Sequence, residues 1–128
     1  MASVHQNKVL GETKKIQAGN VITYGELSER IFGHAKGGRA IGSALKYWWH
    51  HPKYSDDWGL HRVMANGDQY EKGHRCDEVL KKHPNRNLMK KFIHPKDKKI
   101  YWGRSAYLRQ KEGYYSKNNM SEPIFINK

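Results

Sequence analysis

Residues 21–49 read VITYGELSERIFGHAKGGRAIGSALKYWW, and this stretch decides the fold. Thr23 to Glu26 has the S/T-x-x-E form of a capping box, which predicts a helix that begins at Tyr24 and ends at Gly33. A second helix is predicted from Lys36 to Trp49, because apolar residues recur there at intervals of three and four: Ala40, Ile41, Ala44, Leu45 and Trp48. Two helices separated by such a short turn make a helix-turn-helix candidate.

The flanking segments complete a mainly α fold with a small β element. Val4 to Ile16 carries a loose helical stripe of apolar side chains. His61 to Met64 suggests a short strand that enters an Asn-Gly turn at 66–67, and Cys76 to Lys82 predicts one more helix, stopped before the next proline. We expect one globular domain over residues 1–88, followed by a basic, aromatic-rich extension over residues 89–128.

The charge of the chain indicates a polyanionic partner. The 128 residues contain 24 Lys and Arg against 12 Asp and Glu, a formal net charge of +12. Because neutralised phosphates release condensed counterions, such a charge favours nucleic acid over an anionic membrane surface or a merely soluble protein. No apolar run approaches the length of a membrane span, and a single cysteine, Cys76, excludes an intramolecular disulfide framework. We therefore expect a cytoplasmic, nucleoid-associated protein, or a nuclear one in a eukaryote, without contact with a membrane.

The second predicted helix opens with small residues around one long cation. Gly37, Gly38, Gly42 and Ser43 surround Arg39 in the sequence. Small side chains on a DNA-facing helix allow close approach to a groove, and Arg39 would then reach furthest in. The same pattern is also typical of close helix–helix packing with a solvated arginine, so both interpretations stay open at this point.

Three motifs carry a resemblance to a known family. The segments Val21–Leu27, Lys36–Leu45 and His61–Gly67 occur in the same order as in the DNA-binding domain of O6-alkylguanine-DNA alkyltransferases, which the chain resembles over roughly residues 4–83. The resemblance implies a winged-helix-like domain that lays its recognition helix in the DNA minor groove. It also implies that Tyr24 helps to rotate a nucleotide out of the stack, while Arg39 fills the vacated space. The implied DNA contacts are Tyr24, Lys36, Gly37, Gly38, Arg39 and Ser43.

The chain departs from the family at the nucleophile. The family reads Pro-Cys-His-Arg where this sequence reads Gly59-Leu60-His61-Arg62, so Leu60 stands at the position of the reactive cysteine. The family also activates its cysteine through the histidine and a later glutamate, and His83 stands where that glutamate is expected. With two parts of the relay missing, we expect no alkyl transfer and no enzymatic activity.

This combination resembles the alkyltransferase-like proteins, which bind alkylated guanine without repairing it and pass the lesion to nucleotide excision repair. The resemblance implies a monomeric, non-enzymatic damage sensor, with duplex DNA containing alkylated guanine and repair proteins as partners. The implied base pocket consists of Trp58, Leu60, His61, Arg62 and Val63. The loop before it is longer than usual, so either Trp58 or Leu60 lines the pocket. The alternative function is generic winged-helix DNA binding without lesion specificity.

Histidines offer a further rival interpretation. His50, His51, His61, His74, Cys76 and His83 match no tight zinc spacing, so we predict neither a metal site nor a cofactor. A nuclease site that combines His50, His51 and His74 with Asn66 lacks paired carboxylates and is disfavoured.

The segment from Pro84 to Lys128 holds eleven basic and three acidic residues together with seven aromatic ones. Such a mixture can track phosphates and stack on bases, whereas its apolar stretches Ile100–Trp102 and Tyr107–Leu108 can pack back onto the domain. We expect the extension to do both.

Overall fold

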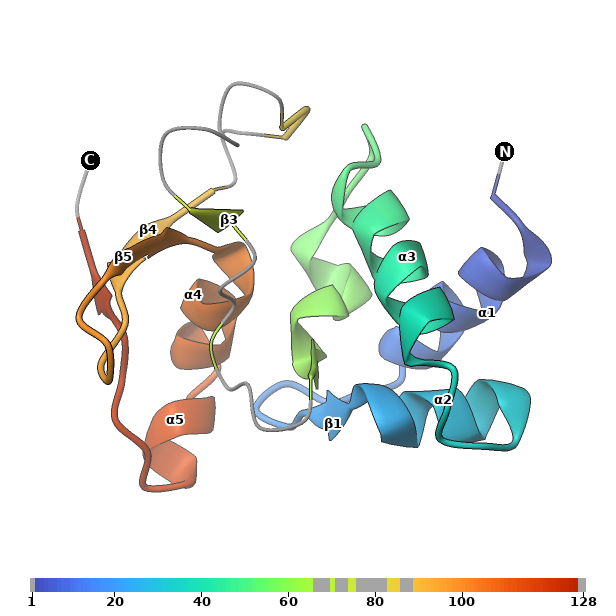
Figure 1. The fold of residues 1–128 in the computed structure, drawn as a ribbon, viewed down its shortest axis with the longest axis horizontal. Helices are drawn as coiled ribbons and strands as arrows, with labels where there is room; N and C mark the ends of the chain where they lie inside the picture. The colour runs from blue at the N-terminus through green and yellow to red at the C-terminus, as the bar shows by residue number, and fades with distance from the viewer. Residues whose placement is uncertain (1, 66–69, 71–73, 76–82, 86–88, 127–128) are drawn as a thin grey trace.

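A computed structural model of the chain describes residues 2–65, 70, 74–75, 83–85 and 89–126 (Figure 1). Its helices are α1 (Val4–Thr13), α2 (Tyr24–Phe32), α3 (Gly38–Trp49), α4 (Arg104–Lys111) and α5 (Tyr114–Lys117), with 3-10 turns η1 (Asp56–Trp58) and η2 (Leu60–Arg62). Its strands are β1 (Ile22–Thr23), β2 (Val63–Met64), β3 (His74–Arg75), β4 (Lys91–Ile93), β5 (Ile100–Trp102) and β6 (Ile124–Phe125). The predicted class, mainly α with a small β element, is confirmed.

The capping box predicted for α2 is present. The Thr23 side chain accepts a hydrogen bond from the Glu26 backbone N–H, and the Glu26 side chain accepts one from the Thr23 N–H. The helix ends at Gly33, whose φ of 82° lies in the left-handed region that favours glycine. Both predicted bounds of this helix are therefore confirmed, because they depend on local chemistry alone.

Two other helices are shorter than predicted. α1 ends at Thr13 rather than Ile16, because the backbone after Thr13 tightens into i→i−3 hydrogen bonds, from Lys15 to Glu12 and from Ile16 to Thr13. α3 begins at Gly38 rather than Lys36, because its first intrahelical hydrogen bond runs from the Ile41 N–H to the Gly37 carbonyl.

The predicted strand from His61 to Met64 is partly wrong. His61 and Arg62 belong to η2, and only Val63–Met64 forms a strand, β2, which pairs in parallel with β1. The Asn-Gly turn at 66–67 and the helix predicted over Cys76–Lys82 lie outside the described residues. The winged-helix arrangement stays a prediction.

The extension folds into a second layer together with β3, which lies within residues 1–88. An antiparallel sheet in the order β3-β5-β4-β6 packs with α4 and α5 around its own aromatic core, in which Phe92, Tyr101 and Tyr115 are buried. Figure 1 shows this layer on the left, helices α1 to α3 on the right, and the segment with η1 and η2 between them. Of the stretches expected to pack inward, Ile100–Trp102 and Tyr107–Leu108, the side chains of Tyr101 and Leu108 are buried, whereas Ile100 is 42% exposed and Trp102 and Tyr107 are partly exposed. α4 contacts η2, so the extension reaches the segment that carries the implied base pocket.

No helix in the described part of the chain combines the length and the apolar character that a membrane crossing requires.

Candidate nucleic-acid interface

Tyr24 is the first residue of α2, and it is seated against α3. A Cβ atom added at Gly42 would lie 3.5 Å from the Tyr24 ring, so the small residue at position 42 leaves room for the ring to cross the helix. Tyr24 stays partly exposed in this position. The helix-turn-helix pair thus presents an aromatic side chain beside the exposed side of its second helix.

The turn between α2 and α3 is held by Ser28. Its hydroxyl donates to the His34 carbonyl at 2.6 Å and accepts from the Gly37 N–H at 2.8 Å. A Cβ atom at Gly37 would lie 2.6 Å from both the Phe32 ring and the Ser28 oxygen, which real structures do not tolerate. Packing therefore requires glycine at position 37. A Cβ atom at Gly38 meets nothing within 4 Å, so Gly38 is the glycine that is open to an approaching surface.

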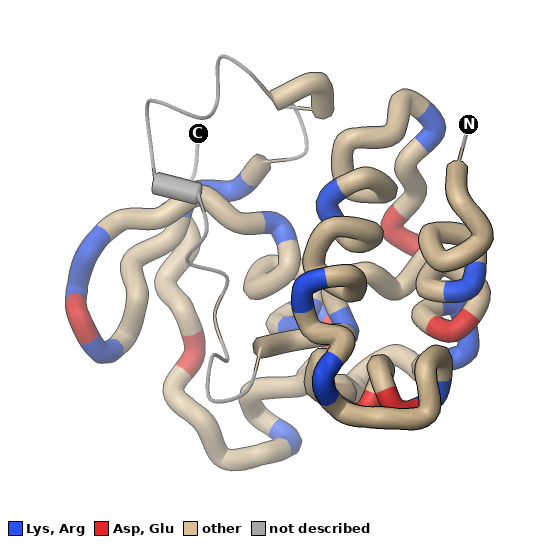
Figure 2. The backbone as a smooth tube through the Cα atoms, turned by 45° about the vertical axis from the view of Figure 1, so that its right-hand side comes forward, with Lys and Arg blue, Asp and Glu red and all other residues tan. Residues whose placement is uncertain are grey.

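The exposed side of α3 is cationic. Lys36, Arg39 and Ser43 are exposed, and neither cation forms an ion pair with any described residue. Arg39 and Lys46 are the charged residues of α3, which carries no Asp or Glu; Figure 2 shows basic positions along this helix in blue. Such a surface attracts phosphates without competition from its own carboxylates.

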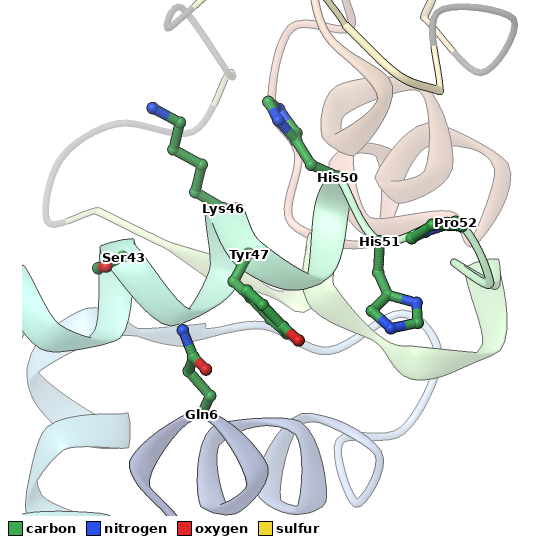
Figure 3. A pocket seen from close by; sticks show the side chains of 7 residues that line it. All are labelled: Gln6, Ser43, Lys46, Tyr47, His50, His51 and Pro52. Atoms are coloured by element: carbon green, nitrogen blue, oxygen red, sulfur yellow. The ribbon is translucent and has the colours of Figure 1, made fainter. Parts of the chain in front are cut away.

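A shallow pocket of about 530 Å³ lies beside the last two turns of α3. Figure 3 shows Lys46 and His50 projecting from the same side of the helix, while Tyr47 and His51 lie on the side that faces Gln6. The cationic side of α3 thus continues for one turn beyond Ser43.

The implied base-pocket residues come together around η1 and η2, but they differ in exposure. Leu60 and Val63 are only 1% and 4% exposed and belong to the hydrophobic core. Trp58 is partly exposed and packs edge to face against Trp48, with 5.4 Å between the ring centroids. Of the two alternatives left open by the sequence, Trp58 is the side chain that offers accessible surface.

The His61 ring is buried and paired with a carboxylate from the extension. Its Nε2 lies 2.7 Å from Oε2 of Glu112, and Arg62 donates to both oxygens of that carboxylate, at 3.1 and 2.7 Å. Arg62 also donates to the Ile16 carbonyl, and the Gly19 N–H donates to Glu112. Glu112 therefore ties η2 to the segment that follows α1.

Burial lowers the pKa of His61 from its ordinary value, although the hydrogen bond and charge of Glu112 oppose this shift. Burial alone would raise the pKa of Glu112, but hydrogen bonds from Arg62 and His61 outweigh it and lower that pKa. At neutral pH the ring is thus uncharged and its Nε2–H donates to an ionised carboxylate. The other ring nitrogen, Nδ1, is buried without a hydrogen-bond partner among the described residues.

Two arginines of α4 hold the same segment. Arg109, 3% exposed, donates to the His61 carbonyl at 2.6 Å and to the Val63 carbonyl at 3.1 Å. Arg104 makes a two-pronged ion pair with Asp56 of η1, at 3.0 and 2.6 Å. The 3-10 turns are therefore positioned by three charged side chains of the extension together with the helical domain.

A family model, the DNA-binding domain of 6-O-methylguanine DNA methyltransferase, matches residues 4–83. The chain belongs to this family. The match includes the helix-turn-helix and the segment with η1 and η2. No curated protein and no solved structure gives a significant match to the chain. The membership shows that the chain carries a DNA-binding domain of the alkylguanine-repair type.

The carboxylate beside His61 is not replaced by His83, as the sequence indicated, but is supplied by Glu112. We predicted that His83 takes the place of the glutamate beside His61, and the structure corrects this. His83 packs against the ring of His50, at 4.3 Å between centroids, while Glu112 makes the hydrogen bond to His61. The carboxylate comes from beyond the matched domain, so an alignment confined to residues 4–83 cannot find it.

Sequence reasoning assigned no role to Arg104, Arg109 or Glu112. One signal was available for the last of these, because Glu112 is the sole acidic residue between Asp97 and Glu122 in a strongly basic segment. Nothing comparable marks Arg109, which is one cation among many. Within the described ranges, no three potential ligands gather into a metal site.

Proposed function

We propose that this chain is a non-enzymatic sensor of O6-alkylguanine in duplex DNA. The observation that carries the proposal is the placement of Arg39. It is exposed and makes no ion pair with the described residues, on a helix without carboxylates, in a DNA-binding domain of the methyltransferase family. Tyr24 lies partly exposed beside the same helix, where the proposal uses it to rotate the target nucleotide.

In the proposed complex, α3 enters the minor groove and the two side chains divide the work. Tyr24 rotates the target nucleotide, and Arg39 inserts its planar guanidinium into the stack that the base has left. Unstacking a base costs a few kcal/mol, and a planar cation recovers part of it through stacking and contacts with acceptors. Lys36 and Ser43 contact the backbone phosphates, and Gly38 leaves the start of α3 open to close approach.

The extruded base is received beside η1 and η2. Trp58 is the accessible wall of the proposed pocket, and Leu60, His61 and Val63 form its buried backing, with Arg62 at its edge. An aromatic surface favours an alkylated guanine over the more polar unmodified base. Since His61 is neutral and already pairs with Glu112, it contributes a rigid, uncharged backing.

The proposal includes no chemistry on the lesion. The acceptor of an alkyl group must be a nucleophile, and the leucine side chain at position 60 carries no nucleophilic atom. The neutral histidine and its carboxylate thus have no thiol beside them to activate. The protein would act as a monomeric sensor in the cytoplasm or nucleus, and its binding would mark the lesion for nucleotide excision repair. The rival function is generic DNA binding without preference for the lesion.

The test is the ratio of affinities for an O6-methylguanine duplex and the matched guanine duplex, measured at one salt concentration. We expect wild-type protein to prefer the lesion, and Arg39→Ala to lose most of that preference. Arg30→Ala is the matched control, because Arg30 is exposed on the neighbouring helix α2. A wild-type ratio near one, or equal losses on both duplexes for Arg39→Ala, contradicts the sensor.

A further inference from the structure

α4 has two faces with different tasks. Its buried face carries Arg109, which holds η2, and Glu112 directly follows the helix to reach His61. Its outer face carries Arg104, Tyr107 and Lys111, at spacings of three and four residues that place them on one side of a helix. Of these three side chains only Arg104 has a part in the site described above, through its ion pair with Asp56.

Three cations converge on the Tyr107 ring. The Lys90 ammonium lies 4.8 Å from the ring centroid, the Lys111 ammonium 5.4 Å and the Arg104 guanidinium 5.6 Å. The ring itself is fixed by an edge-to-face contact with Phe125, at 5.3 Å between centroids. Each cation–π contact is weakly favourable at an exposed site, so the ring can hold side chains together that would otherwise repel one another.

The positive charge of this Tyr107 cluster is only partly compensated. Asp56 neutralises Arg104, whereas neither Lys90 nor Lys111 forms an ion pair with a described residue. Two ammonium groups beside one ring, with no ion-pair partner among the described residues, attract an anion. A phosphate group has the required charge and several acceptor oxygens.

We propose that the Tyr107 cluster binds a backbone phosphate of the same DNA duplex that α3 engages. Arg104 joins the cluster to η1 through Asp56, and η1 ends at Trp58, so the cluster is continuous with the proposed base pocket. A duplex held by residues 4–83 presents its phosphates at high effective concentration to a cationic site on the same chain. The cluster adds affinity that is independent of the lesion and extends the footprint beyond the family domain.

This inference relies on the family's DNA binding but not on lesion recognition, and the experiment separates the two. Binding of Lys90→Ala/Lys111→Ala to both duplexes is measured across a series of salt concentrations. Because log K falls with log salt by about 0.9 per phosphate contact, we expect the slope to decrease by about 0.9 when the contact with one phosphate is lost. At about 0.15 M salt that corresponds to a loss of roughly fivefold, equal for both duplexes.

Two further variants control for charge and for the ring. Lys8→Ala/Lys14→Ala removes the same charge from exposed positions on and just after α1, and we expect its slope to match the wild type. Tyr107→Leu keeps every charge but removes the aromatic ring that the cations contact. Its affinity for the duplex should therefore lie between the affinities of the two double variants. Shortening one flank of the duplex should abolish the difference between Lys90→Ala/Lys111→Ala and wild type once the contacted phosphate is gone.

The proposal is wrong if the salt slope of Lys90→Ala/Lys111→Ala equals that of the α1 control. It is also wrong if these variants differ from wild type only in binding a free mononucleotide, since the site would then serve a soluble anion. A wild-type affinity ratio near one for the lesion refutes the sensor function, while a reduced salt slope still supports the phosphate site.

Discussion

Replacing Glu112 by glutamine perturbs the connection between the extension and η2 while keeping the shape of the side chain. The carboxylate accepts hydrogen bonds from His61 Nε2, from Arg62 Nε and Nη2, and from the Gly19 N–H. It is 17% exposed, and its partners His61 and Arg62 are 1% and 13% exposed, so solvent can replace little of what is lost.

The expected cost follows from this burial. Removing one partner of a buried ion pair costs about 3–5 kcal/mol, because the remaining charge stays desolvated without compensation. Whole domains are stable by only about 5–15 kcal/mol, so Glu112→Gln should lose a large share of the total. For a chain of this length the midpoint of thermal unfolding should fall by roughly 10–20 °C.

Urea unfolding at pH 7.5 measures the free energy directly, with thermal unfolding as a second readout. Glu122→Gln is the matched control, because Glu122 is exposed and accepts a single hydrogen bond, from Gln110. That variant should change stability by less than about 0.5 kcal/mol. A loss below about 1 kcal/mol for Glu112→Gln would show that the pairing contributes little, and would refute the reasoning.

Three other predictions follow from the same structure. Because the folded-state pKa of His61 is lowered, its ring is neutral in both the folded and the unfolded chain at higher pH. Below about pH 6.5 the unfolded chain takes up a proton at this ring and the folded chain does not, so the free energy of unfolding should decrease as the pH drops. Urea unfolding of His61→Gln should show a shallower decrease over that range, and an equal decrease would exclude His61 as the cause. Gly37→Ala should cost about 1–3 kcal/mol through the clash with Phe32, whereas Gly38→Ala, which meets open space, should be close to neutral; similar losses for the two would contradict the packing account. A duplex carrying a radiolabelled O6-methylguanine should leave no label on the protein after denaturation, and label on Cys76 would overturn the non-enzymatic assignment.

The start and end of α2 could be predicted from the sequence because the determinants are local. A capping box and a left-handed glycine act within a few residues, so they mark the two ends of the helix without reference to distant segments. The family resemblance over 4–83 was likewise readable, since it depends on the order of short motifs. Arg39 was singled out on the same basis; it is exposed in the structure, and its role in base flipping stays a prediction.

The partner of His61 could not be predicted, because it is supplied from 51 positions away. The sequence pointed to His83, the residue that occupies the family's aligned position, and no periodic pattern connects η2 with residue 112. The same holds for the partner of β2, because β2 pairs with β1, some forty residues earlier in the chain. Contacts of this kind depend on the tertiary packing of segments that are far apart in the sequence, which local propensity does not predict.

The sequence by itself thus determined the helix-turn-helix, its exposed cation and the absence of a thiol at position 60, since each is a property of a single residue or of adjacent turns. Only the tertiary structure decided that Gly37 serves packing while Gly38 faces open space, and that the basic extension folds back to supply Arg104, Arg109 and Glu112. The physical reason is that a buried ion pair forms only where several elements together exclude water.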